Sequence, residues 1–452
     1  MTSKAGERLS HIARWMGQLP PALLALLAVS HRLLSLRRLL PVLFAIGVGL
    51  SFAGSSAPTD RQLRFQTIAS VVAGREFSLA GWEWTALGEK VQSWRGGTGR
   101  GLTTEQERAV VFGYIEGIRR VRQAQERVHR LVSITAAEAE VAQARQELAH
   151  LRARQQGRRP LTEAVIQRQV GQILVEAGLG VNGIPAPPVN FTFTEPPQIL
   201  IISPRNEIRN VHARMLAPDI DSAEAGQRES AIRERTGYSA YITRIGGLGA
   251  YPTMVVESTN IEWFISTVAH EWVHNYLTLF PLGMRFGSSP ELTTLNETVA
   301  DIVGNEVGRR VLRHFYPEFA PPDTPPPPLQ NVPANGSAPA EPAGFDFNRE
   351  MRVTRLRVDE LLAEGNYTEA EAYMETRRRL FVENGYLLRV LNQAYFAFHG
   401  SYATGGASSS PIGAQLQELQ RVKTPEDIAG FLHTVRWFTS AADLERVLGV
   451  PE

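Results

Sequence analysis

The chain has 452 residues, which is enough for two or three domains. Hydrophobic residues make up 43% and charged residues 21%, as in an ordinary globular protein. The net charge of +1 and the lack of a basic-aromatic module argue against a nucleic-acid partner. Because there is no cysteine, the composition excludes thiolate metal ligands, disulfides, a catalytic cysteine and a lipobox lipid anchor.

Residues 1–58 are predicted to be a signal peptide or a membrane-anchor segment. Basic residues, ending with Arg37 and Arg38, precede an apolar run at residues 39–53, and small residues follow it. This order is typical of a signal peptide. A retained anchor is the alternative, although a spanning helix needs about 20 apolar residues. In both cases the basic flank predicts a protein of the cell membrane or an exported one, with its bulk outside the cytoplasm. A buried or interfacial helix of a soluble protein is the remaining alternative.

Residues 59–180 are predicted to be a helical region. Apolar residues recur at heptad spacing from Val111 to Val132, and in a second register from Val141 to Leu151. The slip between the registers indicates a break near Ser133 or a helical hairpin. One interpretation is a coiled coil that forms a homo-oligomer through residues 103–156. The other is a long helix that packs on the rest of the protein.

Short strands are predicted in the first part of residues 181–319. Alternating or continuous apolar runs, rich in β-branched and aromatic residues, occur at 189–194, 198–203, 239–244 and 251–256. We expect a small sheet packed on the helix that follows. With helices on both sides in the sequence, the predicted fold class is α+β and mostly helical, with a helical C-terminal region after the sheet.

The helix after these strands carries the sequence His-Glu-x-x-His. Thr259 is predicted to cap the helix together with Glu262, and apolar residues then recur at close to a 3.6-residue period. His270 and His274 are four residues apart and lie on one face, so both imidazoles can reach one ion. Glu271 is adjacent, where its carboxylate can accept a proton from water. A chance motif on a surface helix, with solvated side chains, is the alternative.

A second helix is predicted to begin at Ser289-Pro290 and to carry Glu297 and Asp301 on one face. A tetrahedral catalytic zinc uses three protein ligands and keeps one open position. Glu297 is the natural third ligand beside His270 and His274, so Zn²⁺ is the predicted cofactor. Asp301 is then placed to accept a hydrogen bond from a ligand histidine, which fixes its tautomer.

Residues 320–345 are predicted to be a proline-rich linker, and residues 346–452 a helical region. The latter contains an aromatic segment that ends at Tyr402. Peptide hydrolysis passes through an oxyanion that a tyrosine or histidine donor can stabilise. Tyr402 is our first candidate for this role and His399 the second. The alternative is an aromatic helix end that packs into a core and stops at Gly400.

The paired motifs at 270–274 and 296–301 resemble those of the gluzincins, the thermolysin-like zinc metallopeptidases. The resemblance covers about residues 259–312. It implies His270, His274 and Glu297 as zinc ligands, Glu271 as the general base and Asp301 as a partner of a ligand histidine. It also implies that residues 181–319 are a zincin catalytic domain. Trp272 departs from the usual pattern, but its ring would face away from the metal.

Two weaker resemblances concern substrate binding. In gluzincins a sheet edge binds the substrate backbone by strand addition, and residues 246–251 would supply that edge. Asn392, Ala394 and Tyr402 are similar to an Asn-x-Ala…Tyr motif in a bacterial family of predicted aminopeptidases that also carry HExxH. In the gluzincin plan, residues 346–452 would complete the cleft.

The predicted function is therefore a zinc-dependent peptidase, a hydrolase that acts on a peptide or protein substrate and is held at the membrane by its N-terminal segment. The alternative is an envelope-anchored scaffold or binding protein whose metal site is structural or degenerate. A structural zinc would have four protein ligands, whereas a catalytic one keeps a position open.

Overall fold

A computed structural model describes residues 59–95, 99, 101–320, 345–423 and 427–449. The chain divides into two compact units, residues 1–66 and 67–452. The predicted signal or anchor segment at 1–58 lies outside the described residues. Within the described ranges, no helix is long and apolar enough to cross a bilayer.

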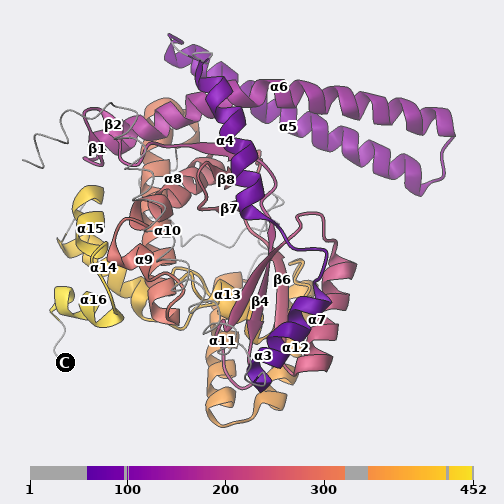
Figure 1. The fold of residues 1–452 in the computed structure, drawn as a ribbon, viewed down its shortest axis with the longest axis vertical. Coiled ribbons are helices and arrows are strands. Elements are labelled where there is room, and N and C mark those ends of the chain that lie inside the picture. Colours follow the sequence, from indigo (N-terminus) through magenta and orange to yellow (C-terminus); the bar gives the residue numbers. More distant parts are fainter. Residues whose placement is uncertain (1–58, 96–98, 100, 321–344, 424–426, 450–452) are drawn as a thin grey trace, which may run out of the picture. The chain divides into compact units, whose positions relative to one another are not determined.

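The protein is mostly helical with short strands, so the predicted fold class is confirmed (Figure 1). The helices of the described residues are α3 (Asp60–Val71), α4 (Leu79–Arg95), α5 (Thr104–Ser133), α6 (Glu138–Glu176), α7 (Ser222–Thr236), α8 (Ile261–Leu277), α9 (Pro281–Met284), α10 (Pro290–Phe315), α11 (Phe347–Ala363), α12 (Tyr367–Glu383), α13 (Gln393–His399), α14 (Ile412–Lys423), α15 (Ile428–Val435) and α16 (Ala441–Leu448). A 3₁₀ turn, η1, spans Pro317–Phe319. The strands are β1 (Gly180–Val181), β2 (Ile184–Pro185), β3 (Phe191–Phe193), β4 (Gln198–Ser203), β5 (His212–Leu216), β6 (Ser239–Arg244), β7 (Gly247–Leu248) and β8 (Thr253–Val255).

Helices α5 and α6 form an antiparallel hairpin, which is one of the two arrangements predicted from the register slip (Figure 1). Helix α5 ends at Ser133, and Arg127 pairs with Glu147 across the two helices at 3.0 Å. Near the base, Gln155 donates to the carbonyl of Tyr114 at 3.2 Å. Both helices contribute to the same hydrophobic core as α8 and α10. The hairpin is therefore built onto the core that carries the HExxH helix.

Helix α6 continues through Pro160 without a break. Proline removes one N–H and disfavours a helix interior. Contacts made by the residues on both sides of Pro160 compensate for this cost. Before the proline, Arg158 donates to the carbonyl of Gly113 at 3.0 Å, and after it Val165 and Ile166 are fully buried. Tertiary contacts thus outweigh the local preference for a break.

The strands form two separate three-stranded sheets, in the orders β3-β8-β7 and β5-β4-β6, besides the small β1-β2 pair. In the first, β3 is parallel to β8 and β7 is antiparallel to it at the edge. The second is antiparallel throughout. We had expected one small sheet, and β5 and α7 were not predicted. Strand β5 lacks a clean alternation of buried and exposed residues, so its sequence carries no strand period.

Two hydrophobic cores organise the described part of residues 67–452. The larger contains α5, α6, α8, α10 and the C-terminal helices α14 to α16. The smaller joins β4 and β6, through Ile201 and Tyr241, to α11, α12 and α13. Asn392 ties α13 to the second sheet because its amide donates to the carbonyl of Ala240 at 2.9 Å. The chain after α13 then returns to the larger core. This return determines which of its residues reach the candidate site described in the next section.

Candidate metal centre

Helices α8 and α10 lie side by side and supply the HExxH residues and the second motif (Figure 1). Asn260, and not Thr259, is the N-cap of α8, since its side chain accepts from the backbone N–H of Trp263 at 3.0 Å. Helix α10 begins at Pro290 as predicted, and Ser289 is its N-cap. Gly304 allows the close approach of the two helices: a Cβ there would lie 2.9 Å from the Cα of His270. The glycine thereby sets the distance between the two motifs.

The side chains of His270, His274 and Glu297 converge on one point. The two Nε2 atoms are 3.1 Å apart, and each lies 3.6 Å from Oε2 of Glu297. Four ligands at about 2.0–2.1 Å in a tetrahedron lie roughly 3.3 Å from one another, so this triangle has the size of one face of a zinc site. The histidine side chains are 14% and 17% exposed, so the point is recessed but can be reached from solvent.

The other ring nitrogen of each histidine has its own partner. Nδ1 of His270 lies 3.1 Å from Oδ1 of Asp301, as predicted, and Nδ1 of His274 lies 2.7 Å from Oδ1 of Asn296. The Asn296 amide nitrogen faces the carbonyl of Leu282 at 3.4 Å, which leaves its oxygen for His274. In the neutral tautomer that these partners favour, each Nδ1 carries the proton and each Nε2 turns its lone pair to the common point.

This donor set fits a divalent metal ion. Two Nε2 lone pairs that face each other at 3.1 Å repel, and a cation between them removes the repulsion. Within the described part of the chain, Oε2 of Glu297 is buried without a hydrogen-bond partner. Such an orphaned acceptor is costly unless a ligand satisfies it. Two imidazoles and one carboxylate are also a donor set that catalytic zinc uses.

Glu271 lies beside the converging ligands and is covered by the edge strand β7. It is buried, and a Cβ on Gly247 would collide with its Oε1 at 2.4 Å. Gly249 lies over His274, where a Cβ would come within 3.1 Å of the histidine Cβ. Burial, together with the negative charges of Glu297 and Asp301, raises the pKa of Glu271 against the lowering effect of the histidines. Strand β7 is the edge strand of its sheet, and Gly247 and the adjoining Gly249 turn only backbone toward Glu271 and His274.

Burial and charge act in opposite directions on the converging residues. Burial lowers the pKa of His270, but the neighbouring carboxylates of Asp301 and Glu297 outweigh this and raise the pKa well above its ordinary value. Burial raises the pKa of Glu297, but the two histidines hold it far below the usual range. The carboxylate is consequently anionic, which is the form that binds a metal ion.

Residues 402–404 bring the C-terminal region to the site. The ring of Tyr402 lies 6.4 Å from that of His270, and the Thr404 hydroxyl donates to Oδ2 of Asp301 at 3.1 Å. The N–H of Ala403 donates to the hydroxyl of Thr298 at 3.2 Å. Burial, followed by the charges of Glu297, Asp301 and Glu271, raises the pKa of the Tyr402 hydroxyl well above its usual value. Tyr402 thus lies among the carboxylates as a protonated donor.

The structure places His399 elsewhere. Its Nε2 lies 3.2 Å from the hydroxyl of Tyr241, and its ring lies 4.2 Å from that of Tyr395. Burial among these groups lowers the pKa of His399 to about 3. His399 belongs to the smaller core, and of our two oxyanion candidates only Tyr402 comes to the converging ligands. Gly400 ends α13, as in the alternative interpretation of this segment.

Several residues at the site were not identified from the sequence. Asn296 directly precedes Glu297, and the helical positions that put Glu297 and Asp301 near the histidines also bring Asn296 to His274. That signal was available in the sequence. Thr404 and Gly304 carry no comparable signal, because their roles depend on contacts with distant segments.

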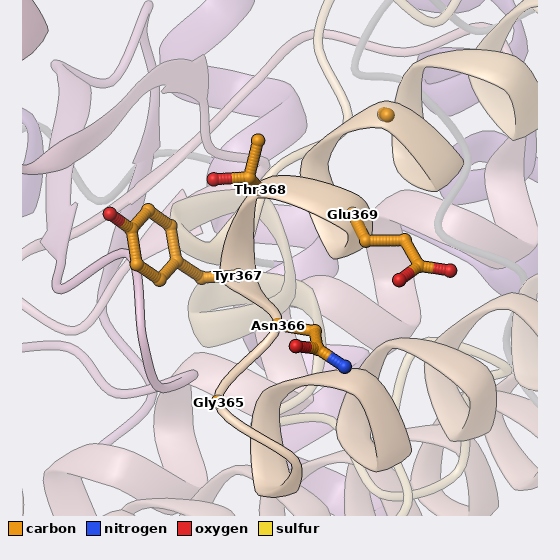
Figure 2. A pocket seen from close by; sticks show the side chains of 6 residues that line it. Gly365, Asn366, Tyr367, Thr368 and Glu369 are labelled. Atoms are coloured by element: carbon orange, nitrogen blue, oxygen red, sulfur yellow. The ribbon is translucent and has the colours of Figure 1, made fainter.

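A surface hollow of about 440 Å³ lies at the start of α12, and none of the converging residues lines it. Figure 2 shows its side chains spread in different directions, with Tyr367 and Glu369 on opposite sides of the helix turn. Tyr367 packs instead against the guanidinium of Arg205 at 4.9 Å. The hollow has no convergent donor set, so the metal centre is the candidate functional site. Comparison with protein-family models, curated proteins and solved structures finds no match to this chain.

Proposed function

We propose that the protein is a zinc-dependent peptidase of the gluzincin type. The observation that carries the proposal is the convergence of two Nε2 atoms and an orphaned carboxylate oxygen within 3.6 Å. Three ligands leave room for substrate, whereas a structural zinc would need a fourth protein ligand. The buried Glu271 beside them suits a base, and the bare β7 edge suits an extended peptide.

His270, His274 and Glu297 would hold the ion. Zinc, when bound, polarises the peptide carbonyl and a water molecule. Glu271 takes a proton from the water as its oxygen attacks the carbonyl carbon, and delivers that proton to the amine nitrogen as the C–N bond breaks. Tyr402 donates a hydrogen bond to the carbonyl oxygen as negative charge develops on it. Asp301 and Asn296 keep both histidines in the ligand tautomer.

Metal content tests the first part of the proposal. We expect about one zinc per full-length chain, and a large loss of zinc in Glu297→Ala, because one of three ligands is removed. Glu306→Ala is the matched control, since Glu306 lies on the same helix and both glutamates are 9% exposed. A folded wild-type protein that binds no zinc when zinc is supplied would overturn the proposal.

Catalysis is tested separately with Glu271→Gln. We expect this variant to keep its zinc and to lose peptidase activity by roughly 10²–10⁴-fold, the usual contribution of a general base. Activity of the wild type should disappear with a chelator and return with zinc. Zinc binding without any hydrolysis of a peptide library would favour the scaffold alternative with a structural or degenerate site.

A further inference from the structure

The loop that carries Tyr402 is irregular and largely buried. Residues 400–411 connect α13 to α14, and residues 405–408 are the most enclosed part of this connection. Backbone carbonyls that are buried in this way need hydrogen-bond partners, because water does not reach them. The partners of these carbonyls therefore show what holds the loop in place.

Two arginines of helix α11 supply these partners. Nη1 of Arg355 donates to the carbonyl of Ala407 at 3.1 Å, and Nη1 of Arg352 donates to the carbonyl of Ser408 at 2.9 Å. Because the two arginines are three residues apart, they lie on one face of the helix. Another face of α11 packs in the smaller core. Helix α11 thus connects that core to the loop.

Arg355 contacts both ends of the loop segment 400–407. A Cβ on Gly400 would lie 2.8 Å from Nη1 of Arg355 and 3.1 Å from the carbonyl oxygen of Ala407. The chain therefore returns close to its starting point, and the guanidinium lies at the junction. Asp359 holds the guanidinium there, since Nε of Arg355 donates to its carboxylate at 2.9 Å. The Arg355 side chain is only 13% exposed, so these bonds are shielded from water.

The residues between the two ends enter the candidate metal centre. Tyr402 lies beside His270, and Thr404 bonds to Asp301. Without fixed ends, a loop of this length would sample many conformations, each with a different position of the tyrosine hydroxyl. A misplacement of about 1 Å at a reacting centre can cost roughly 10²-fold in rate. The junction at Arg355 is thus a point on which the position of Tyr402 depends.

We propose that Arg355 is a positioning residue: by joining the two ends of residues 400–407, it holds the Tyr402 hydroxyl where the oxyanion develops. This inference rests on the proposed peptidase function. Arg355 acts through the loop and has no part in metal binding. Removal of its guanidinium should therefore matter only while the Tyr402 hydroxyl is present.

The first test is kinetic, with the zinc-loaded full-length protein and the peptide that it cleaves best in a proteome-derived library. Arg355→Met removes the donors and keeps an unbranched side chain next to Phe396. We expect kcat to fall roughly 10- to 100-fold, with KM and zinc content near the wild-type values. Arg357→Met is the matched control, because Arg357 lies on the same helix and pairs with Glu360 at the surface. It should leave kcat unchanged.

A double-mutant cycle separates positioning from a general effect on the fold. In Tyr402→Phe, which lacks the hydroxyl, adding Arg355→Met should lower kcat by no more than about threefold. A damaged fold would instead lower kcat by the same factor with and without the hydroxyl, and that result would overturn the proposal.

Arg352→Met is the second variant, for use if Arg355→Met does not fold. Arg352 is exposed and holds only the carbonyl of Ser408, so its removal should have a smaller effect on kcat. That effect should also disappear in Tyr402→Phe. An effect of equal size in both backgrounds would again contradict a positioning role.

Fluorine NMR gives a readout without turnover. A fluorotyrosine at position 402 of the full-length protein should give narrow signals in the wild-type background and in Arg357→Met. In Arg355→Met the signals should shift and broaden, because the loop ends are released. Unchanged signals in Arg355→Met would overturn the role of Arg355 alone. An absence of zinc-dependent hydrolysis by the wild type would instead overturn the proposed function.

Discussion

The helix pair α8–α10 and the segment 402–404 meet at one site but are held there in different ways. The convergence of His270, His274 and Glu297 follows from spacing along each helix and from one close contact between the helices at Gly304. Tyr402 and Thr404 depend on α13, which is fixed in the smaller core by Asn392 and by the rings around His399. The first region needs only its own helices and their packing, whereas the second needs a correctly formed second core.

This difference predicts a separation of roles. Changes in the helix pair should affect metal binding and stability together. Changes in the segment after α13 should affect catalysis while leaving most of the metal site in place. A hydrogen bond from Thr404 to Asp301 links the two regions directly. A change at this contact should therefore affect both metal binding and catalysis.

Among the changes that compare the two regions, Tyr402→Phe should have the largest effect, and this effect is on catalysis. Loss of the hydroxyl removes a donor to the developing oxyanion, which typically costs about 10²–10³-fold in kcat. Zinc content should stay at the wild-type level. Tyr395→Phe is the control, because Tyr395 is buried seven residues earlier in the smaller core. Equal kcat values for the wild type and Tyr402→Phe would remove Tyr402 from the mechanism.

Gly304→Ala should damage the helix pair. The added Cβ would meet backbone atoms of His270 at 2.9 Å, and backbone cannot move aside as a flexible side chain can. We expect a loss of about 1–3 kcal/mol in the free energy of unfolding, with weaker zinc binding. Urea unfolding with and without zinc measures both. Gly226→Ala, a helical position with nothing within 4 Å, should instead stabilise by roughly 0.5–1 kcal/mol. Similar effects of the two variants would contradict the close-packing role.

His399 should make stability sensitive to acid. Its folded-state pKa of about 3 is below the ordinary value, so the neutral ring is favoured in the native protein. The associated stability is present above about pH 6.5 and is lost as the pH falls toward 3. From pH 7 to 5 the wild type should lose up to about 2 kcal/mol more than His399→Gln. The exposed His150→Gln should track the wild type, and parallel curves for all three would refute the assignment.

The smallest effect is expected for Thr404→Val, which removes the hydrogen bond to Asp301 while keeping the side-chain shape. Partners of a ligand histidine typically contribute 10–100-fold in metal affinity. Thr404 bonds to Asp301 and does not contact the histidine itself, so we expect a loss at the low end of this range, about tenfold in zinc affinity. Competition with a chromogenic chelator measures it. Thr434→Val, whose hydroxyl bonds only within α15, should bind zinc as the wild type does. An unchanged affinity in Thr404→Val would show that the two regions are independent.

Much of the helix pair was predictable because its determinants are local. The spacing of His270 and His274 places both on one helix face whatever surrounds them. The same holds for Glu297 and Asp301, and the structure brings all four together. Strands β4 and β6 also have the predicted bounds, since their apolar runs are long enough to carry the signal. In each case the pattern lies within one element.

Other features were decided only by the tertiary structure. Helix α6 continues through Pro160 because the residues on both sides are held by packing. The strands divide between two sheets, and Asn260 replaces Thr259 as the cap of α8. The sequence could not decide whether Tyr402 or His399 reaches the converging ligands, because the two are three residues apart in one aromatic segment. Their separation depends on how α13 docks against β4 and β6, and such contacts between distant segments leave no period in the chain.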